Sequence, residues 1–195
     1  MSGTGMSPTT WPRIRKAAVV RGETLIFRDA TVTDAEFILS LRTDEKKSRF
    51  LSATKNDLKM QKAWLDRYAS TDDEAYFIIE FESSPIGTVR LYDAHQNSFC
   101  WGSWILADGR PRQAAMESAM MVYADAVDRL GFTACHFDLR KENVRVWQFH
   151  ERWGARRVGE TEIDYLYSLD LEAILSSRQR YGRFLPHAVT VGHVG

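Results

Sequence analysis

The order of patterns between Trp101 and Glu160 constrains the fold more strongly than any other feature of this chain. A run rich in aromatic and β-branched residues is followed by apolar residues at helical spacing from 111 to 130, where Gly131 is suited to end a helix. A second strand pattern covers Thr133 to Leu139, and a second helical pattern covers Asn143 to Trp153. Strands on both sides of a long helix predict a sheet with helices packed on it.

The sequence on both sides of this run adds further strands and helices to the predicted sheet. We expect strands at 24–28, 75–80, 86–92, 99–106 and 161–169, and helices capped by Thr33 or Asp34 and by Asn56 or Asp57. The fold class is therefore α/β (α+β), with a mixed, mostly antiparallel sheet of six to seven strands and helices on both faces. We expect a flexible leader over residues 1–22, one domain over 23–170 and a partly helical extension over 171–195.

The composition of the chain narrows its class and its partners. With 195 residues, 44% of them hydrophobic, the chain can form one complete core. Lys plus Arg and Asp plus Glu both number 26, so no overall basic field attracts nucleic acid or a membrane, and we expect neither as a partner. Cys100 and Cys135 lie in apolar strand patterns, which indicates buried thiols in a reducing compartment. Because no membrane-length apolar stretch or signal peptide is recognised, we expect a cytoplasmic protein.

The loop before the long helix has features of an anion-binding site. The first amides of a helix lack partners within the helix and favour negative charge. Here Pro111 preorganises the first turn, Arg110 and Arg112 add positive charge, and the small Ala114 and Ala115 let a ligand approach the backbone. The same residue types also begin helices for reasons of stability alone, so the loop by itself leaves both interpretations open.

Joined to the segments that follow, this loop resembles the pyrophosphate loop of the GNAT superfamily of N-acetyltransferases. In that family a strand leads into an R/Q-x-x-G-x-G/A loop and a long helix, and then into a further strand and an Asn-initiated helix. This chain reads Arg110-Pro111-Arg112-Gln113-Ala114-Ala115, then Leu130-Gly131-Phe132 at the helix end, then a helix from Asn143 that closes on Trp153-Gly154-Ala155. The match covers most of residues 24–169.

The resemblance implies a fold, a co-substrate and a reaction. Two central strands of the sheet are expected to splay, acetyl-CoA is expected to enter the splay, and an acceptor amine is expected to attack the thioester directly, without a covalent enzyme intermediate. No metal is expected. The residues expected to contact acetyl-CoA are Ile105, Leu106, Arg110, Arg112, Gln113, Ala114, Ala115, Asn143 and Trp147.

Gln113 departs from the family pattern, and Asn143 has a second possible role. Gln113 occupies the slot where the family usually has its first glycine, so the approach of the backbone to the pyrophosphate would depend on neighbouring amides and on the Gln side chain. Asn143 is also a favoured N-cap at the start of a helix, which is an alternative to contact with the pantetheine or the substrate.

Three side chains are candidates for proton transfer. His150 stands where many GNAT members carry the tyrosine thought to protonate the departing thiolate, and its reference pKa near 6.5 suits that role. The alternative for His150 is packing or surface exposure at the helix end. Alternation places His136 and Asp138 on one face of their strand, where either of them, or a water chain, could take a proton from the acceptor. The alternative is an exposed polar face, or a hydrogen bond to Arg140.

Acceptor binding is predicted from strand alternation and from the position of a charged stretch. Trp101 and Ser103 share a strand face by alternation, and Arg49 and Phe50 lie in a charged stretch placed like the variable acceptor-side loop of GNAT enzymes. These four residues are therefore candidates for contact with the acceptor, and Arg42 or Arg49 could bind an acceptor phosphate. Core packing of the aromatic residues and solvation of the arginines are the alternatives.

The acceptor itself, a small-molecule or peptide amine, stays open between several classes. The phrase Ile86-Gly87-Thr88-Val89-Arg90-Leu91-Tyr92-Asp93 is similar to GNAT proteins associated with amino-sugar acetylation, which favours a nucleotide-linked amino sugar. A protein N-terminus, a polyamine or an antibiotic is the alternative acceptor, and a CoA-binding module without catalysis is the alternative to an enzyme. The five histidines are too scattered along the chain to suggest a metal site. Exposed sheet edges make a homodimer a reasonable expectation.

Overall fold

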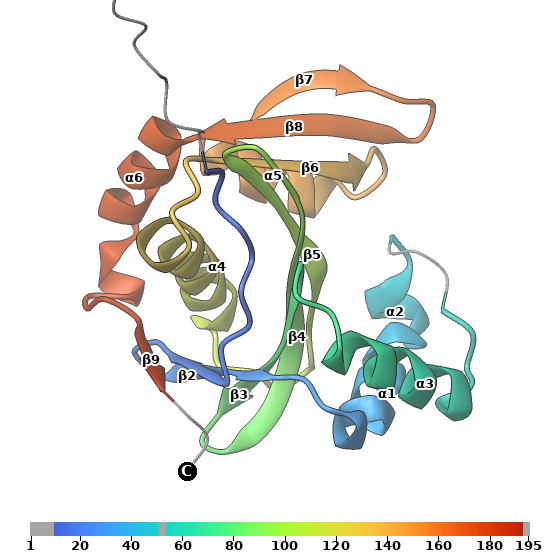
Figure 1. The fold of residues 1–195 in the computed structure, drawn as a ribbon. Coiled ribbons are helices and arrows are strands. Elements are labelled where there is room, and N and C mark those ends of the chain that lie inside the picture. Colours follow the sequence, from blue (N-terminus) through green and yellow to red (C-terminus); the bar gives the residue numbers. More distant parts are fainter. Residues whose placement is uncertain (1–9, 51–53, 193–195) are drawn as a thin grey trace, which may run out of the picture.

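A nine-stranded sheet runs through the computed structural model, which describes residues 10–50 and 54–192 (Figure 1). The strands are β1 (Val19–Arg21), β2 (Leu25–Asp29), β3 (Ala75–Phe81), β4 (Ser84–His95), β5 (Ser98–Leu106), β6 (Ala134–Arg140), β7 (Arg156–Glu160), β8 (Asp164–Asp170) and β9 (Thr190–Gly192). Their order is β7-β8-β6-β5-β4-β3-β2-β1-β9, and all neighbours are antiparallel except β5 and β6. The mixed, mostly antiparallel sheet is confirmed, whereas the predicted count of six to seven strands is too low.

Helices cover both faces of the sheet, as the sequence predicts (Figure 1). On one face lie α1 (Ala35–Arg42), α2 (Glu45–Ser48) and α3 (Leu58–Ala69), and on the other lie α4 (Ala114–Ala124) and α6 (Leu171–Arg180). The remaining elements are α5 (Val144–Arg152), the short turns η1 (Val32–Asp34) and η3 (Gly182–Phe184), and η2 (Asp125–Arg129), a π-helical continuation of α4. Within the part of the chain that the structure describes, no helix has the length and apolar character needed to cross a membrane.

The alternation of side chains along β3 explains how the sheet is covered on both faces. Tyr76 and Ile78 pack with α1 and α3, whereas Phe77 and Ile79 join the larger core beneath α4. The five side chains from Ala75 to Ile79 are all buried. A strand with this unbroken burial lies in the interior of a sheet that carries helices on both sides.

Local chemistry sets the ends of several helices. The Asp57 carboxylate accepts a hydrogen bond from the Met60 amide and caps α3, and Asp170 caps α6 in the same way. Gly131 has a φ of +83° after the long helix, a conformation that glycine adopts without steric cost. The predicted cap at Gly131 is confirmed, and α6 begins at Leu171, within the extension expected to be partly helical.

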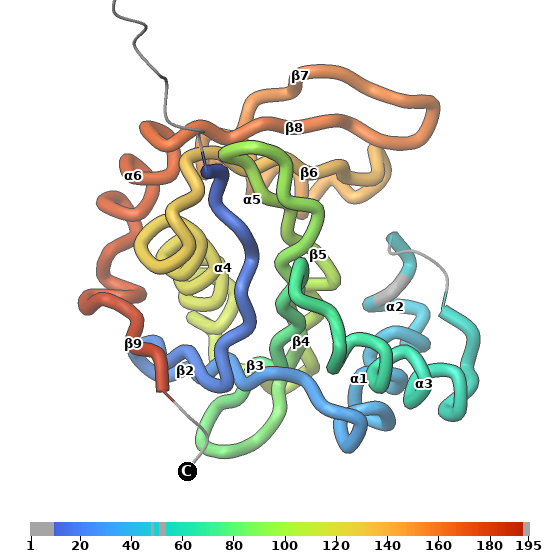
Figure 2. Tube along the Cα trace, in the orientation of Figure 1, coloured from blue at the N-terminus to red at the C-terminus, as the bar shows by residue number. Residues whose placement is uncertain are grey.

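The terminal segments are part of the sheet, which corrects the expected flexible leader. Ile14 is buried, and Val20 of β1 pairs with Phe27 of β2 and with Val191 of β9, so β1 and β9 lie side by side (Figure 2). Residues 1–9 of the expected leader lie outside the described residues. A strand of three residues carries too short a pattern to be recognised, and it is held in place only by its neighbours.

The predicted last strand, 161–169, is one half of a hairpin. β7 precedes β8 and pairs with it from Arg156↔Ser168 to Glu160↔Tyr165. The side chains of β7 are mostly exposed, so the strand lacks the apolar alternation that marks a half-buried strand. The hairpin extends the sheet beyond β6 and adds an edge that the sequence did not reveal.

Candidate active site

The parallel strands β5 and β6 splay apart, as the resemblance implies. They pair only at Ser98↔Ala134 and Phe99↔Cys135, and over the rest of their length they diverge. On the α4 side of the sheet α5 fills the gap, with the His150 ring centred 5.2 Å from the Trp101 ring. One edge of β5 is therefore left without a strand partner, and an extended ligand can form hydrogen bonds with such an edge.

A β-bulge in β5 lies beside this opening. Arg90 pairs with Gly102 and Thr88 with Ile105, so β5 carries one extra residue between these two pairs. Ser103 adopts a φ of +47°, and Thr88 Oγ1 donates a hydrogen bond of 2.8 Å to the Ser103 carbonyl. The bulge interrupts the alternation of β5 and redirects the side chains that follow it.

As a result Trp101 and Ser103 do not share a face, which corrects the expectation from alternation. Trp101 is 4% exposed on the α4 side, where its indole N–H donates to the Tyr123 hydroxyl at 3.2 Å. Ser103 lies on the α1–α3 side, where Arg42 Nη1 is 3.4 Å from its Oγ. Of these two candidates for acceptor binding, Ser103 alone faces away from the core.

The loop between β5 and α4 presents unpaired amides. The Ala114 amide donates to the Pro111 carbonyl at 3.0 Å and closes a tight turn. The amides of Ala115 and Met116, which begin α4, donate to no acceptor among the described residues. Because the helix dipole adds partial positive charge at the same point, this end of α4 favours an anion.

The side chains of the loop agree with that charge preference. Arg110 Nη1 donates to the Ala107 carbonyl at 3.0 Å, and Arg112 is exposed beside it. Gln113 is the N-cap, with a φ of −79° that any residue adopts, so this position does not require glycine for its conformation. Two guanidinium groups next to free amides are suited to a diphosphate.

His150 is buried, which contradicts the charged-acid role that the sequence suggested. The residue is 4% exposed and is enclosed by Trp101, Phe137 and Phe149, with the Phe137 ring centred 4.4 Å away. Its Nδ1 atom finds no hydrogen-bond partner among the described residues. Burial lowers the pKa of His150 to about 3. The imidazole is therefore neutral at pH 7 and has no extra proton to give.

His136 and Asp138 lie on the same face of β6 but in different surroundings. His136 Nδ1 is 2.7 Å from Ser98 Oγ and its Nε2 is 3.3 Å from Asp93 Oδ2, at the end of the splay where β5 and β6 still pair. Asp138 is exposed further along the strand. Burial raises the pKa of the Cys100 thiol to about 12, and the nearby Asp138 charge adds to this rise. Asp138 therefore lies close to the face of β5 that turns away from α4.

Asn143 and Trp147, at the start of α5, differ in whether their side chains are already engaged in contacts within the protein. The Asn143 carbonyl accepts hydrogen bonds from the amides of Val146 and Trp147, but its side chain makes no capping bond. Trp147 Nε1 donates to the Lys141 carbonyl at 3.1 Å, and its ring packs edge-on against Tyr165. The Asn143 amide group can thus meet a ligand, whereas Trp147 is held by the fold.

A basic cavity of about 470 Å³ lies on the α1–α3 side of the sheet, beside the bulge. Ser103 contributes to its wall, and Trp64 and Tyr76 add aromatic surface. Its charged lining consists of four basic side chains and one acidic one, namely Arg42, Lys55, Arg67, Arg90 and Asp57. A cavity of this size with a surplus of positive charge is suited to a small anionic molecule.

The basic cavity is held by contacts between the helices and the sheet. Arg42 Nε donates to Thr54 Oγ1 at 2.7 Å. Arg90 forms an ion pair with the largely buried Glu74, and its guanidinium lies 5.4 Å from the centre of the Trp64 ring. The guanidinium groups of Arg42 and Arg90 are therefore placed before any ligand arrives, which reduces the cost of ordering them on binding.

The sequence identified only part of this cavity. It suggested Arg42 and Ser103 but missed Arg90, Lys55 and Arg67. Arg90 follows Thr88 by two positions on a strand with an apolar opposite face, and that alternation could have revealed it. Lys55 and Arg67 carry no pattern that distinguishes them from solvated surface residues.

The other two predicted acceptor residues lie outside the basic cavity. Arg49 is exposed, with its Nη2 atom 3.8 Å from Glu142 Oε2 and its guanidinium 5.1 Å from the centre of the Phe50 ring. Glu142 immediately precedes Asn143, so Arg49 and Phe50 lie near the start of α5. Residues 51–53, which follow them, are outside the described part of the chain.

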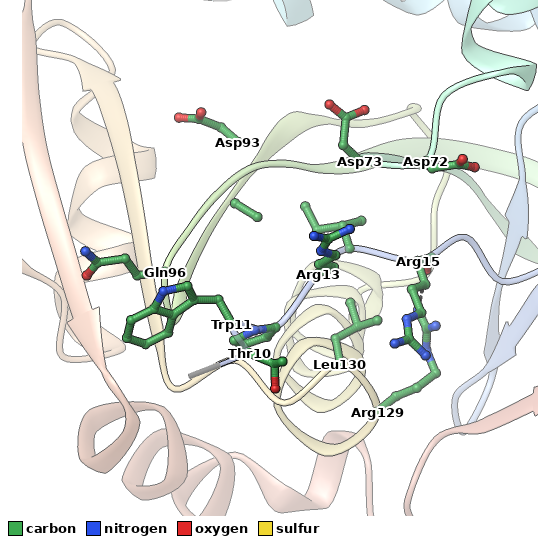
Figure 3. Close-up of a pocket in the computed structure, with 13 residues that line it drawn as sticks. Thr10, Trp11, Arg13, Arg15, Asp72, Asp73, Asp93, Gln96, Arg129 and Leu130 are labelled. Atoms are coloured by element: carbon green, nitrogen blue, oxygen red, sulfur yellow. Dashed lines mark hydrogen bonds between the residues drawn. The ribbon is translucent and has the colours of Figure 1, made fainter. Parts of the chain in front are cut away.

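A larger hollow of about 1180 Å³ lies elsewhere on the molecule (Figure 3). Its walls include Trp11 and Arg13 of the N-terminal segment and Arg129 and Leu130 at the end of η2. It shares no lining residue with the basic cavity and includes no residue of the loop that begins α4. The candidate active site is therefore placed at the splay because the free amides and the basic cavity lie there, although the other hollow is larger.

Comparison with known proteins agrees with this geometry. A family model described as an acetyltransferase (GNAT) domain matches residues 24–156. The solved structure of apo FdhC, described as a nucleotide-linked sugar GNAT, is 39% identical, with a TM-score of 0.77 over 85% of this chain and 97% of that one. No match was found among curated proteins.

More distant structures share the fold. A GCN5-related N-acetyltransferase from Brucella melitensis is 17% identical, with a TM-score of 0.74 over 91% of this chain and 90% of that one. Mutant forms of the spermidine/spermine N-acetyltransferase SpeG from Vibrio cholerae are 16% identical, with a TM-score of 0.63 over 78% of this chain and 97% of that one.

The splayed strands, the bulge and the free amides at the start of α4 form an open strand edge beside an anion site, and the family match shows which class of protein this is. The chain belongs to the GNAT acetyltransferase family and is an N-acetyltransferase. The co-substrate of this family is acetyl-CoA, and its acceptors are amines.

Proposed function

We propose that this protein transfers the acetyl group of acetyl-CoA to the amino group of a nucleotide-linked amino sugar. The observation that carries the proposal is the basic cavity beside the β5 bulge, with four cationic side chains and one carboxylate in its lining. The diphosphate of a sugar nucleotide is an anion that such a lining attracts. FdhC, which is 39% identical to this chain, is described as a nucleotide-linked sugar GNAT.

The charge of the cavity also weighs against the other acceptor classes. A polyamine is a cation, and Arg42, Lys55 and Arg67 would repel it. A peptide N-terminus gains nothing specific from a surplus of positive charge. The structural likeness to SpeG, at 16% identity, therefore supports the fold but not a polyamine acceptor.

The loop residues of this chain fit the co-substrate. We assign the diphosphate of acetyl-CoA to the amides of Ala115 and Met116, with Arg110 and Arg112 as counter-charges. Gln113 and Ala114 complete this turn, and the free edge of β5 at Ile105 and Leu106 is available to the amide groups of the pantetheine arm. The Asn143 side chain borders the same opening.

We assign the role of base to Asp138, acting directly or through water. Its carboxylate is exposed on the face of β6 that turns away from α4, and it can take a proton from the incoming ammonium group. His136 is less suited because Ser98 and Asp93 already engage both of its ring nitrogens. Much of the rate would come from holding the amine and the thioester together, since no covalent intermediate on the protein is needed.

A thiol-release assay tests the acceptor class. Purified protein and acetyl-CoA are offered nucleotide-linked amino sugars, the corresponding free amino sugars, polyamines and N-terminal peptides. Activity with the nucleotide-linked sugars and loss of activity without the nucleotide are expected. Preference for a polyamine or a peptide would contradict the proposal. Silence across the panel, with acetyl-CoA still raising the melting temperature, would favour a CoA-binding module without catalysis.

A matched pair of variants on α3 tests the role of the cavity. Arg67→Ala removes a cation from the lining and is expected to raise the KM for the sugar nucleotide by about 5–30-fold, leaving the KM for acetyl-CoA unchanged. Lys62→Ala removes an exposed cation from the same helix outside the cavity and is the control. If the two substitutions changed the KM for the sugar nucleotide equally, the cavity would not be the acceptor-binding site. A cytoplasmic location and a homodimer stay predictions.

A further inference from the structure

Three potential metal ligands meet at the end of the splay where β5 and β6 still pair. Asp93 and His95 lie at the end of strand β4, and His136 comes from β6. One ligand atom from each lies within 4.8 Å of the other two. His95 Nε2 is 2.8 Å from Asp93 Oδ1, and His136 Nε2 is 3.3 Å from Asp93 Oδ2, so the carboxylate already bridges the two imidazoles.

We propose that Asp93, His95 and His136 bind one Zn²⁺ ion. Two imidazole nitrogens and one carboxylate oxygen are a ligand set that zinc accepts, with a further position left for solvent. Tetrahedral coordination with bonds of about 2.0–2.2 Å places ligand atoms roughly 3.4 Å apart. The distances between these atoms require only small rotations of the three side chains to reach that arrangement.

The surroundings of His136 favour a cation at its Nε2 atom. Ser98 Oγ lies 2.7 Å from Nδ1. In the tautomer whose Nδ1–H donates to this hydroxyl, Nε2 is unprotonated and its lone pair can bind a cation. That nitrogen and Asp93 Oδ2 would then be two acceptors facing each other at 3.3 Å. In that tautomer both atoms can bind a metal ion placed between them. Ser98 thus takes the position of a residue that orients a metal-bound histidine.

The location suggests what the ion would do. β5 and β6 are joined by only two residue pairs, and β5 lies between β4 and β6 in the sheet. An ion held by Asp93, His95 and His136 would tie the β4–β5 hairpin directly to β6, where the splay begins. We assign it a structural role of this kind, independent of the acetyl-transfer reaction.

Zinc binding to the full-length protein tests the proposal. Protein freed of metal with a chelator is titrated with Zn²⁺ at neutral pH, and bound metal is measured after dialysis. One zinc per chain and a rise in melting temperature are expected. Asp93→Asn, His95→Gln and His136→Gln should each weaken binding by at least about 100-fold, and Ser98→Ala by about 10–100-fold. Replacing zinc by Co²⁺ should give visible absorption bands that these variants lose.

Matched controls keep the outcome unambiguous. His187→Gln changes an exposed histidine outside the cluster and should bind zinc like the unmodified protein. Because Asp93 and His95 are exposed, their variants should keep the far-ultraviolet circular dichroism of the metal-free protein. If zinc fails to bind at micromolar concentration, or binds equally to the three ligand variants, the cluster is a hydrogen-bonded Ser98–His136–Asp93 chain and the proposal is wrong.

Discussion

The two faces of β5 place neighbouring residues in opposite surroundings. On the α4 side, Trp101 is buried against Tyr123 and the neutral His150. On the α1–α3 side, Ser103 lies beside Arg42 in the wall of the basic cavity. Because the bulge inserts one extra residue, Trp101 packs in the core whereas Ser103, two positions later, faces the cavity. Substitutions on the first face should therefore change stability, and substitutions on the second should change acceptor binding.

The largest expected effect comes from Trp101→Ala. Removing this buried side chain should lower the free energy of unfolding by about 3–5 kcal/mol, because the cavity left among Tyr123 and His150 is only partly refilled. Urea denaturation measures the change. Trp11→Ala, at a half-exposed tryptophan, is the control and should change stability by less than about 1 kcal/mol. A small loss of stability together with a higher KM for the acceptor would instead support the prediction that Trp101 contacts the acceptor.

The next effect is a dependence of stability on pH through His150. Its pKa of about 3 in the folded protein lies below the value near 6.5 expected when unfolded. The unfolded chain therefore binds more protons between these values. The stabilisation is complete above about pH 6.5 and is lost as the pH falls toward 3, at up to about 1.4 kcal/mol per pH unit.

His150→Phe should remove this slope while largely preserving the packing against Trp101 and Phe137. Urea denaturation at several pH values between about 5 and 7 compares the two proteins, with exposed His187→Phe as the control. The variant should also retain turnover at neutral pH. A slope that persists in the variant would show that His150 is not the group responsible, and a large loss of turnover would restore its role as an acid.

A smaller effect is expected at the bulge itself. Ser103→Val places a β-branched residue at a φ of +47° and should cost about 1–2 kcal/mol of stability, whereas Ser103→Gly accepts that conformation. The Val variant should also raise the KM for the acceptor, because Arg42 loses its contact with the Ser103 hydroxyl. Thermal denaturation and steady-state kinetics measure both changes. Equal melting temperatures of Ser103→Val and Ser103→Gly would mean that the positive φ at this position does not penalise a β-branched residue.

The smallest effect is expected from Gln113→Gly, which restores the residue usual in the family. Because Gln113 already has a helical φ of −79°, glycine relieves no strain. The affinity for acetyl-CoA should change by less than about threefold, and stability by a few tenths of a kcal/mol. Isothermal titration with acetyl-CoA measures the affinity. A gain of tenfold or more would show that the Gln side chain obstructs the pyrophosphate.

Patterns that depend on nearby residues predicted the parts of the fold that carry the co-substrate. The apolar stripe that ends at Gly131, the helix after Asn143 and the strands of the meander follow from local periodicity and capping. β1 and β9 did not emerge, because three residues give no period and each strand exists only through its pairing. β7 did not emerge because both of its faces are largely exposed.

By itself, the sequence determined the acetyltransferase family, the order of the central elements and the charged loop before α4, because each depends on residues close together in the chain. Only the tertiary structure decided that a bulge sends Ser103 to the basic cavity, that Trp101 and Phe137 bury His150 in its neutral form, and that His95 and His136 meet at Asp93. Strand register, burial and the meeting of distant side chains are properties of the packed chain, and local sequence patterns do not record them.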